Sequence, residues 1–406
     1  MVAAGIAVPA APAAAAECLT APGPGQVVAQ TPVEQLVLAA RRVWPTTTGQ
    51  AVTVAVVDTG VDSRHPQLRG AVRQGWDFVE NEPGGTVDCS GHGTAVAGLV
   101  GARVADRVGF AGIAPGVTIL PVRVTERLSA GELTDPAPLA AGIRWAADQG
   151  ADVIAVSLVA ARATEALRAA VAHAVSRDAL VVAAAGTRAS AQTASDPPSY
   201  PAGYPGVLGI GAVDPDGARL ASSPLNSTVD IVAPGAGVLT TAPARGHTPF
   251  SGTGAATPLV AATAALVRSA HPRLGVAEVT HRLLATANPV AGGAGSAAYG
   301  AGMADPARAV TEVLSDSDAR GPAGMPVREV DERALRREAQ WRSLTASALA
   351  IAAAIVLILL GCAALVGLHR RLRRPPRPAL STADHPADAD LAELFFTPPT
   401  PPRPSP

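Results

Sequence analysis

The sequence predicts an α/β fold of three layers, in which a mostly parallel, doubly wound sheet is covered by helices on both faces. Short uninterrupted apolar runs, such as residues 51–57 and 151–158, are typical of strands that are buried on both sides. Residues 138–149 have apolar positions at helical spacing and lie between strand 117–124 and strand 151–158. This alternation of strand and helix indicates a parallel sheet.

Composition and charge exclude several classes of function. The chain of 406 residues is 48% hydrophobic, which is enough material for a large core. Its formal net charge is -1, and basic clusters are confined to the C-terminal fifth, so a nucleic-acid partner is not expected. Three cysteines are too few for a disulfide-built scaffold, although one bridge is possible. No cluster of metal ligands is legible, and we predict neither a metal nor a cofactor.

The N-terminal part of the chain has the composition of a processed leader. Residues 1–17 are apolar and rich in Ala and Pro, and alanines precede Glu17, as at the end of a secretory signal peptide. The basic start of such a signal is missing. A truncated signal peptide explains this, and a disordered leader is the alternative. Residues 18–42 are interpreted as an N-terminal extension.

Cys18 lies in a Gly- and Pro-containing segment that disfavours regular structure. Its candidate partner is Cys89, which lies shortly before His92. A bridge between the two cysteines would tie the extension to the region of His92. It would add about 4 kcal/mol of stability in the chain-entropy model, in an oxidising compartment. Two free buried thiols are the alternative.

Two motifs carry candidate catalytic residues. The run 51–57 ends in Asp58, at the C-terminal tip of a strand, where ligands and catalytic groups collect in doubly wound sheets. An isolated aspartate at such a place is more often a cap or a turn residue. Residues 90–98, Ser-Gly-His-Gly-Thr-Ala-Val-Ala-Gly, place His92 between glycines at the start of a helix of small residues.

The third motif is the segment 252–258, Gly-Thr-Gly-Ala-Ala-Thr-Pro. Together with Asp-Thr-Gly at Asp58 and His-Gly-Thr at His92, it resembles the subtilisin-like serine proteases of peptidase family S8 in motif and in chain order. The resemblance implies that Asp58 orients His92, that His92 transfers a proton, and that Gly254 stands in the position of the catalytic serine. Glycine has no hydroxyl, so covalent acyl transfer cannot occur at this position.

Two further positions depart from the pattern of that family. Strand 180–185 is followed by Gly-Thr, where the family has Gly-Asn and the asparagine donates to the oxyanion. Thr187 is a shorter donor, and loss of one oxyanion donor costs about 2.7 to 4 kcal/mol of transition-state stabilisation. Ser157, Leu158 and Val159 stand where the family has Ser-Leu-Gly along its substrate groove. We expect the branched side chain of Val159 to narrow the path of a bound peptide.

The resemblance covers residues 43–314, which include further strands at 207–213 and 229–232. Residues 315–343 are polar and are interpreted as a linker. Residues 344–368 carry no charge and are long enough to cross a hydrocarbon core of about 30 Å as one transmembrane helix. A buried core helix is the alternative interpretation.

The end of the chain indicates how such an anchor is oriented. Residues 369–374 contain a cluster of arginines, and the positive-inside rule places the basic and then Pro-rich tail, residues 369–406, in the cytoplasm. The protease-like domain is then extracytoplasmic and is held at the cell membrane by a single span.

The whole architecture resembles the mycosins, which are membrane-anchored subtilisin-like proteases associated with type VII secretion systems. The resemblance rests on the extension with Cys18, the Arg-Val-Trp-Pro segment at 42–45, Cys89 beside the His motif and the C-terminal span. It implies type VII secretion membrane components and a polypeptide ligand or substrate as partners. With Gly254 in the serine position, we predict a catalytically inactive pseudoprotease with a structural or peptide-binding role.

Two alternatives to this prediction stay open. One is an active or weakly active serine endopeptidase that processes secreted proteins, which requires Ser251 or Thr253 to replace the missing nucleophile in attack geometry. The other is a cell-envelope adaptor of the same fold without a link to type VII secretion. Peptide cleavage distinguishes the first alternative from the prediction, and copurification with a secretion complex distinguishes the second.

Overall fold

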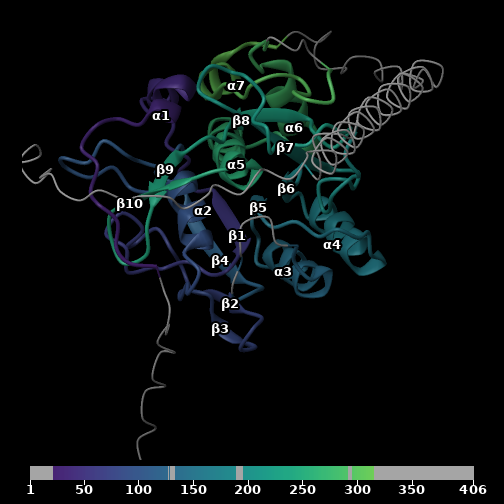
Figure 1. The fold of residues 1–406 in the computed structure, drawn as a ribbon, viewed down its shortest axis with the longest axis horizontal. Helices are drawn as coiled ribbons and strands as arrows, with labels where there is room; N and C mark the ends of the chain where they lie inside the picture. The colour runs from purple at the N-terminus through teal and green to yellow at the C-terminus, as the bar shows by residue number, and fades with distance from the viewer. Residues whose placement is uncertain (1–21, 127, 129–132, 189–194, 291–294, 315–406) are drawn as a thin grey trace, which may run out of the picture. The chain divides into compact units, whose positions relative to one another are not determined.

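A parallel sheet forms the centre of the computed structural model, which describes residues 22–126, 128, 133–188, 195–290 and 295–314 (Figure 1). The sheet is 8-stranded and has the order β3-β2-β4-β1-β5-β6-β7-β8. Neighbouring strands are parallel except for the pair β2 and β3. This confirms the predicted α/β fold with a mostly parallel sheet. The strands are β1 (Thr53–Asp58), β2 (Gly75–Asp77), β3 (Glu82–Gly84), β4 (Thr118–Arg123), β5 (Val153–Val156), β6 (Leu180–Ala184), β7 (Val207–Val213) and β8 (Ile231–Pro234).

Helices cover both faces of the sheet. Alternate residues of β1 show the two faces, because successive side chains of a strand point to opposite sides. Val54 and Val56 belong to one buried core and Ala55 and Val57 to the other, and all four are fully buried. The first core contains residues of α2 (His92–Gly101) and α5 (Thr253–Ala270), and the second contains residues of α3 (Pro136–Asp148) and α4 (Glu165–Ser176).

The direction of strand addition changes at β1. Its neighbours are β4 on one side and β5 on the other, and both pair with it in parallel. In doubly wound sheets, ligands bind outside the carboxyl ends of the strands at such a switch point. The loops after β1 and β5 are therefore the place to look for the site.

Shorter elements complete the described part of the chain. A separate hairpin pairs two antiparallel strands, β9 (Val238–Thr241) and β10 (His247–Phe250). The remaining helices are α1 (Val33–Leu38), the 3-10 helix η1 (Ala40–Arg42), α6 (Val276–Ala285) and α7 (Pro306–Thr311).

The N-terminal extension is bound to the hairpin from the first described residues onward. Gly25 N donates to the Arg245 carbonyl at 2.9 Å, and His247 N donates to the Gln26 carbonyl at 2.9 Å. Val28 N donates to Nδ1 of His247 at 3.1 Å. These bonds join the extension to β10, whose other end leads into α5.

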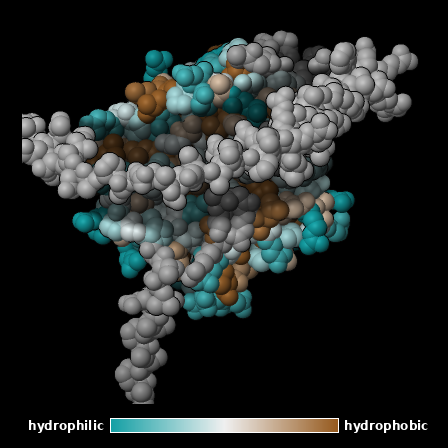
Figure 2. All heavy atoms as spheres, viewed as in Figure 1, coloured by the Kyte–Doolittle hydropathy of each residue, from teal (hydrophilic) through white to brown (hydrophobic). Residues whose placement is uncertain are grey.

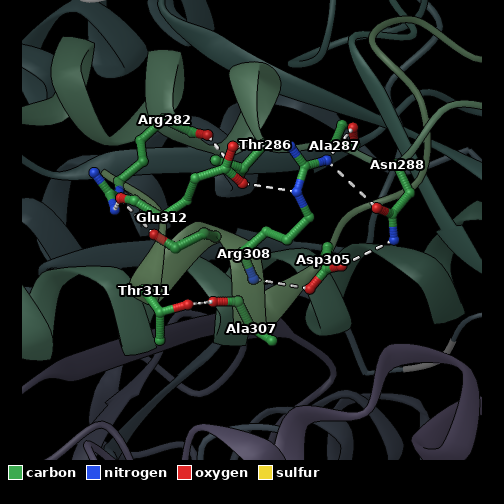
Figure 3. A network of polar contacts seen from close by, with 10 residues as sticks. Arg282, Thr286, Ala287, Asn288, Asp305, Ala307, Arg308, Thr311 and Glu312 are labelled. Atoms are coloured by element: carbon green, nitrogen blue, oxygen red, sulfur yellow. Dashed lines mark hydrogen bonds and ion pairs between the residues drawn. The ribbon is translucent and has the colours of Figure 1, made fainter. Parts of the chain in front are cut away.

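Polar contacts fix α7 against the end of α6 (Figure 3). Asp305 Oδ1 accepts the N–H of Arg308 at 3.0 Å and so caps α7, while Asp305 Oδ2 accepts from Asn288 Nδ2 at 2.9 Å. Within one turn, Arg308 Nε donates to Glu312 Oε2 at 2.7 Å. The last described helix is thus anchored before the chain leaves the described range.

Several predicted segments lie outside the described residues. They are the signal peptide 1–17, Cys18, the linker 315–343, the transmembrane segment 344–368 and the tail 369–406. Within the described ranges, none of the helices combines the length and the apolar character that a membrane crossing requires.

Hydrophilic and hydrophobic residues are interspersed on the described surface that Figure 2 shows. Several exposed large hydrophobic side chains belong to the extension, where Val27, Val33 and Leu36 are 62%, 53% and 64% exposed.

Candidate active site

Asp58 and His92 meet at the carboxyl edge of the sheet. Asp58 is the last residue of β1, and His92 is the first residue of α2. His92 Nδ1 donates to Asp58 Oδ1 at 2.7 Å, and the same oxygen accepts the N–H of Thr59 at 2.8 Å. Asp58 is fully buried, whereas the His92 side chain is 16% exposed and lines a cavity. The aspartate thus fixes the tautomer of the imidazole and leaves Nε2 for the cavity.

Asp88, which the sequence analysis did not single out, holds the loop that carries His92. Its Oδ1 accepts from Thr59 Oγ1 at 2.8 Å and from the N–H groups of Ser90 and Gly91 at 3.1 and 2.8 Å. Its Oδ2 accepts from the N–H and the hydroxyl of Thr94 at 2.8 and 2.6 Å. The sequence does contain a sign of this role, because Asp88 stands shortly before a Ser-Gly pair at the start of a helix. Aspartate side chains at such places commonly accept hydrogen bonds from nearby backbone N–H groups.

The two carboxylates determine the charge of His92. Burial lowers the pKa of His92, but the charge and hydrogen bond of Asp58, with the charge of Asp88, outweigh burial and raise the pKa above its ordinary value. Burial also raises the pKa of the Asp88 carboxyl, against its hydrogen bonds to Thr94, Gly91 and Thr59. The imidazole therefore keeps its second proton to a higher pH than a free histidine does.

Gly254 lies in the first turn of α5, next to His92. Its φ is outside the left-handed region, so its backbone conformation does not require glycine. A Cβ added to Gly254 would lie 3.7 Å from His92 Nε2, 3.6 Å from Phe250 Cζ and 3.4 Å from the carbonyl oxygen of Ser157. These are ordinary van der Waals separations. A serine side chain therefore fits, and its hydroxyl would be within reach of Nε2.

Ser157 supports the same turn by a route that the sequence analysis missed. Pro258 lies inside α5 and has no N–H, so the carbonyl four residues earlier, that of Gly254, loses its helical donor. Ser157 Oγ donates to this carbonyl at 3.0 Å. The residue after β5 thus compensates for the proline and holds the first turn of α5 in place.

Thr187, which we predict at the oxyanion position, lines the same cavity. It is exposed, and the residue before it, Gly186, has a φ of 99°. The carbonyl of Gly186 accepts from Thr253 Oγ1 at 2.9 Å. This bond ties the loop after β6 to the start of α5 and uses the hydroxyl proton of Thr253.

The cavity has a volume of about 750 Å³. It brings together the candidate residues His92, Ser157, Leu158, Val159, Thr187 and Gly254. Among its described lining residues, the charged side chains are those of His92 and Arg188, and the others are polar or apolar. Arg188 pairs with Asp196 at 3.4 Å. No group of three or more His, Cys, Asp or Glu in the described chain is placed to hold a metal ion.

The wall formed by Val159 is partly paired within the chain. Its carbonyl accepts the N–H of Thr134 at 2.8 Å, and the next residue, Ala160, exchanges two hydrogen bonds with Tyr200 at 2.8 and 3.0 Å. An extended peptide that adds as a strand to another segment needs free main-chain groups there. The Val159 carbonyl is therefore not free to accept a hydrogen bond from a peptide. The branched side chain of Val159 restricts the same wall further.

Phe250 is another lining residue that the motifs did not indicate. Its ring lies 5.0 Å from the His92 ring, with an angle of 88° between the planes. This edge-to-face contact restrains the imidazole. Ser251 follows it in the chain, and its Oγ accepts the N–H of Gly237 at 2.9 Å.

Known proteins share both the sequence pattern and the fold. A family model described as "Subtilase family" matches residues 49–302. Thermitase from Thermoactinomyces vulgaris is 40% identical over 230 residues, which are 57% of this chain and 79% of thermitase.

Solved structures of type VII secretion proteases are also similar. The MycP3 protease from the type VII (ESX-3) secretion system is 33% identical with a TM-score of 0.61, over 71% of this chain and 92% of MycP3. MycP1 from Mycobacterium smegmatis is 29% identical with a TM-score of 0.64, over 77% of this chain and 93% of MycP1.

Proposed function

Because the chain belongs to the subtilase family, we propose that it is a mycosin-like component of a type VII secretion system that does not cleave peptides. In this proposal the groove binds polypeptide and the domain has a structural or peptide-holding role. The single observation that carries the proposal is Gly254, since the position beside His92 Nε2 has no hydroxyl.

The chemistry that the dyad of Asp58 and His92 retains is limited. Without a nucleophile no acyl-enzyme forms, and in subtilisin itself the loss of the serine lowers kcat by about 10⁶-fold. His92 can still act as a general base on water, which contributes about 10² to 10⁴-fold. Thr187 in place of an asparagine weakens the oxyanion side further.

The neighbouring hydroxyls are poor substitutes for the serine. Thr253 is 5% exposed, and its Oγ1 donates to the carbonyl of Gly186. Ser251 Oγ accepts from the N–H of Gly237, away from α5. Neither residue occupies the position of Gly254 in the first turn of α5, so we propose that neither replaces the nucleophile.

The proposal includes attachment to the cell membrane. The similarity to structures described as coming from type VII secretion systems supports the association, and the uncharged segment 344–368 with its arginine-rich flank supports a single span. We also propose a disulfide between Cys18 and Cys89, because an extracytoplasmic domain lies in an oxidising environment. Cys89 is disulfide-bonded, and Cys18 lies outside the described residues.

Labelling with a fluorophosphonate probe tests the absence of activity. The full-length native chain should remain unlabelled, and Gly254→Ala, which adds a carbon without a hydroxyl, is the matched control. A labelled native chain would show an unexpected nucleophile and favour the endopeptidase alternative. Copurification with type VII secretion membrane components tests the partner, and its failure would leave an envelope adaptor as the better interpretation.

A further inference from the structure

We propose that the cavity of this chain recognises the C-terminal carboxylate of a polypeptide, held between His92 and the first turn of α5. This inference rests on the proposed function, because it names the chemical group that a peptide-binding groove without a nucleophile would recognise. One carboxylate oxygen would lie beside His92 Nε2, where the hydroxyl of a serine at position 254 would lie.

The space for this group lies over Gly254. The nearest atoms to an added Cβ are the Ser157 carbonyl oxygen at 3.4 Å, Phe250 Cζ at 3.6 Å and His92 Nε2 at 3.7 Å. Because Gly254 has no side chain, no Cβ stands between a ligand in the cavity and His92 Nε2. The space opens to the main cavity, since His92, Phe250 and Gly254 all line that cavity.

Donors surround this space. His92 uses Nδ1 for Asp58, so its protonated ring presents Nε2–H to the cavity. The N-cap residue of α5, Gly252, provides no side-chain cap. The N–H groups of Ala255 and Ala256 bond to the Gly252 carbonyl, whereas the N–H of Gly254 belongs to the turn that has no intrahelical acceptor. The positive end of the helix dipole adds to this preference for an anion.

The charges around the cavity also favour an anion. His92 and Arg188 are the charged side chains among its described lining residues, so no described Asp or Glu side chain lines it. Asp58 and Asp88 lie behind His92, where they hold its proton, and Asp196 pairs with Arg188. A carboxylate in the cavity therefore meets hydrogen-bond donors and no described acidic side chain.

A chain end fits this cavity better than a continuous peptide strand. An internal carbonyl carries only a partial charge, whereas a carboxylate forms charge-assisted hydrogen bonds, which are roughly twice as strong as neutral ones. Main-chain pairing is also restricted, because the Val159 carbonyl is already bonded to the N–H of Thr134 at 2.8 Å. Much of the affinity for a peptide then comes from its C-terminal carboxylate.

Fluorescence anisotropy on the full-length protein tests the proposal. The probes are a library of fluorescein-labelled tetrapeptides, each prepared with a C-terminal carboxylate and, separately, with a C-terminal amide. We expect peptide acids to bind about tenfold or more tightly than their matched amides. Excess sodium acetate should displace them only weakly, because the peptide adds apolar contacts in the cavity.

Matched variants locate the effect. His92→Gln should remove the preference for the acid, and Gly254→Ala should weaken acid binding by filling the space while leaving His92 in place. His173→Gln should keep the preference, because His173 forms an equally short pair with Asp148, at 2.7 Å, but does not line the cavity.

The outcomes separate this inference from the proposed function. Equal binding of acids and amides would overturn the carboxylate proposal and leave a peptide-binding groove. Binding of neither form would contradict both. Acetate that competes as well as any peptide acid would show a site for small carboxylates and would overturn the polypeptide source.

Discussion

The two sides of the candidate site differ in how fully their functional groups are present. On one side, Asp58, Asp88 and His92 form a buried network in which each group has its expected partner. On the other side, the positions of the nucleophile and of the oxyanion donor hold Gly254 and Thr187. Yet Gly254 has an ordinary φ, room for a side chain and a tethered carbonyl. The comparison teaches that the backbone at Gly254 accepts a side chain that the sequence does not supply.

The largest effect is expected from restoring the nucleophile. Gly254→Ser places a hydroxyl beside His92 Nε2 in a turn that accepts a Cβ without a clash. The serine is worth about 10⁶-fold in subtilisin, and the weak oxyanion side removes about 10² to 10³-fold of it. Peptide hydrolysis should therefore rise by about 10³-fold or more, measured as kcat/KM on a fluorogenic peptide library.

Gly254→Ala is the control for this restoration, because it adds the same carbon without the hydroxyl. A restored serine that hydrolyses no faster than this control would mean that the two sides do not align, and the contrast between them would disappear.

The next effect comes from the oxyanion side. Thr187 lines the same cavity as His92, and the longer amide of Thr187→Asn should reach a developing oxyanion. Added to Gly254→Ser, it should raise kcat by about 10²-fold or more, with a smaller change in KM. Thr187→Ser in the same background keeps a short hydroxyl and should give no gain. Equal rates for the two double variants would show that Thr187 does not limit the site.

A smaller effect is expected on stability, from the hydrogen-bond network around Asp88. Asp88 is buried and accepts hydrogen bonds from Thr59, Ser90, Gly91 and Thr94. Asp88→Ala leaves these donors without a partner, so the free energy of unfolding should fall by about 3 kcal/mol in urea titrations.

Asp135→Ala is the control for the Asp88 prediction, because it removes an exposed aspartate that accepts a single hydrogen bond. Asp135 is an exposed cap of α3 that accepts from Ala137 N at 3.0 Å, and its loss should cost about 1 kcal/mol. Similar losses for the two variants would mean that the Asp88 network contributes little to the fold.

The smallest effect concerns pH. Burial, with the charge of His65, lowers the pKa of His247 to about 4, from an ordinary value of 6.5. Between these values the unfolded chain binds the extra proton, so stability present above pH 6.5 is lost as pH falls towards 4. His92 has the opposite sign: its raised pKa gives stability that is lost as pH rises through that pKa. The Tm should therefore fall on acidification, and less so in His247→Gln.

Hydrogen exchange gives a local check on the pH prediction. The neutral His247 ring accepts the N–H of Val28 and pairs with Gln67 Oε1 at 2.8 Å. Exchange at Val28 should accelerate as pH falls, after correction for its intrinsic pH dependence. Unchanged protection of Val28 at pH 4 would contradict the assignment of the lowered pKa to this contact.

The sequence was sufficient for the parts of the fold with a strong local signal. Strand 51–57 was predicted where β1 covers Thr53–Asp58, and helix 138–149 where α3 covers Pro136–Asp148. The strands β2 and β3 and the hairpin of β9 and β10 were not predicted. Each has only three or four residues, which is too short for a periodic pattern.

The site was predictable where chemistry and chain order coincide, as at Asp58, His92 and Gly254. Phe250 and Asp88 were missed because their roles depend on where separate loops meet in space. The bond from Ser157 to the Gly254 carbonyl was also missed, since it follows from a proline elsewhere in α5 and from the path of the chain after β5. Local sequence does not carry such contacts between loops.

The central proposal is that the missing hydroxyl at Gly254 and the short donor at Thr187 together separate this site from a nucleophilic one. The burst of nitrophenol released from a nitrophenyl ester in the first turnover tests it most directly, because the burst counts acylated active sites. The native chain should show no burst, and Gly254→Ser combined with Thr187→Asn should show a burst that approaches one equivalent per chain. A burst from the native chain, or none from the restored chain, would contradict the account.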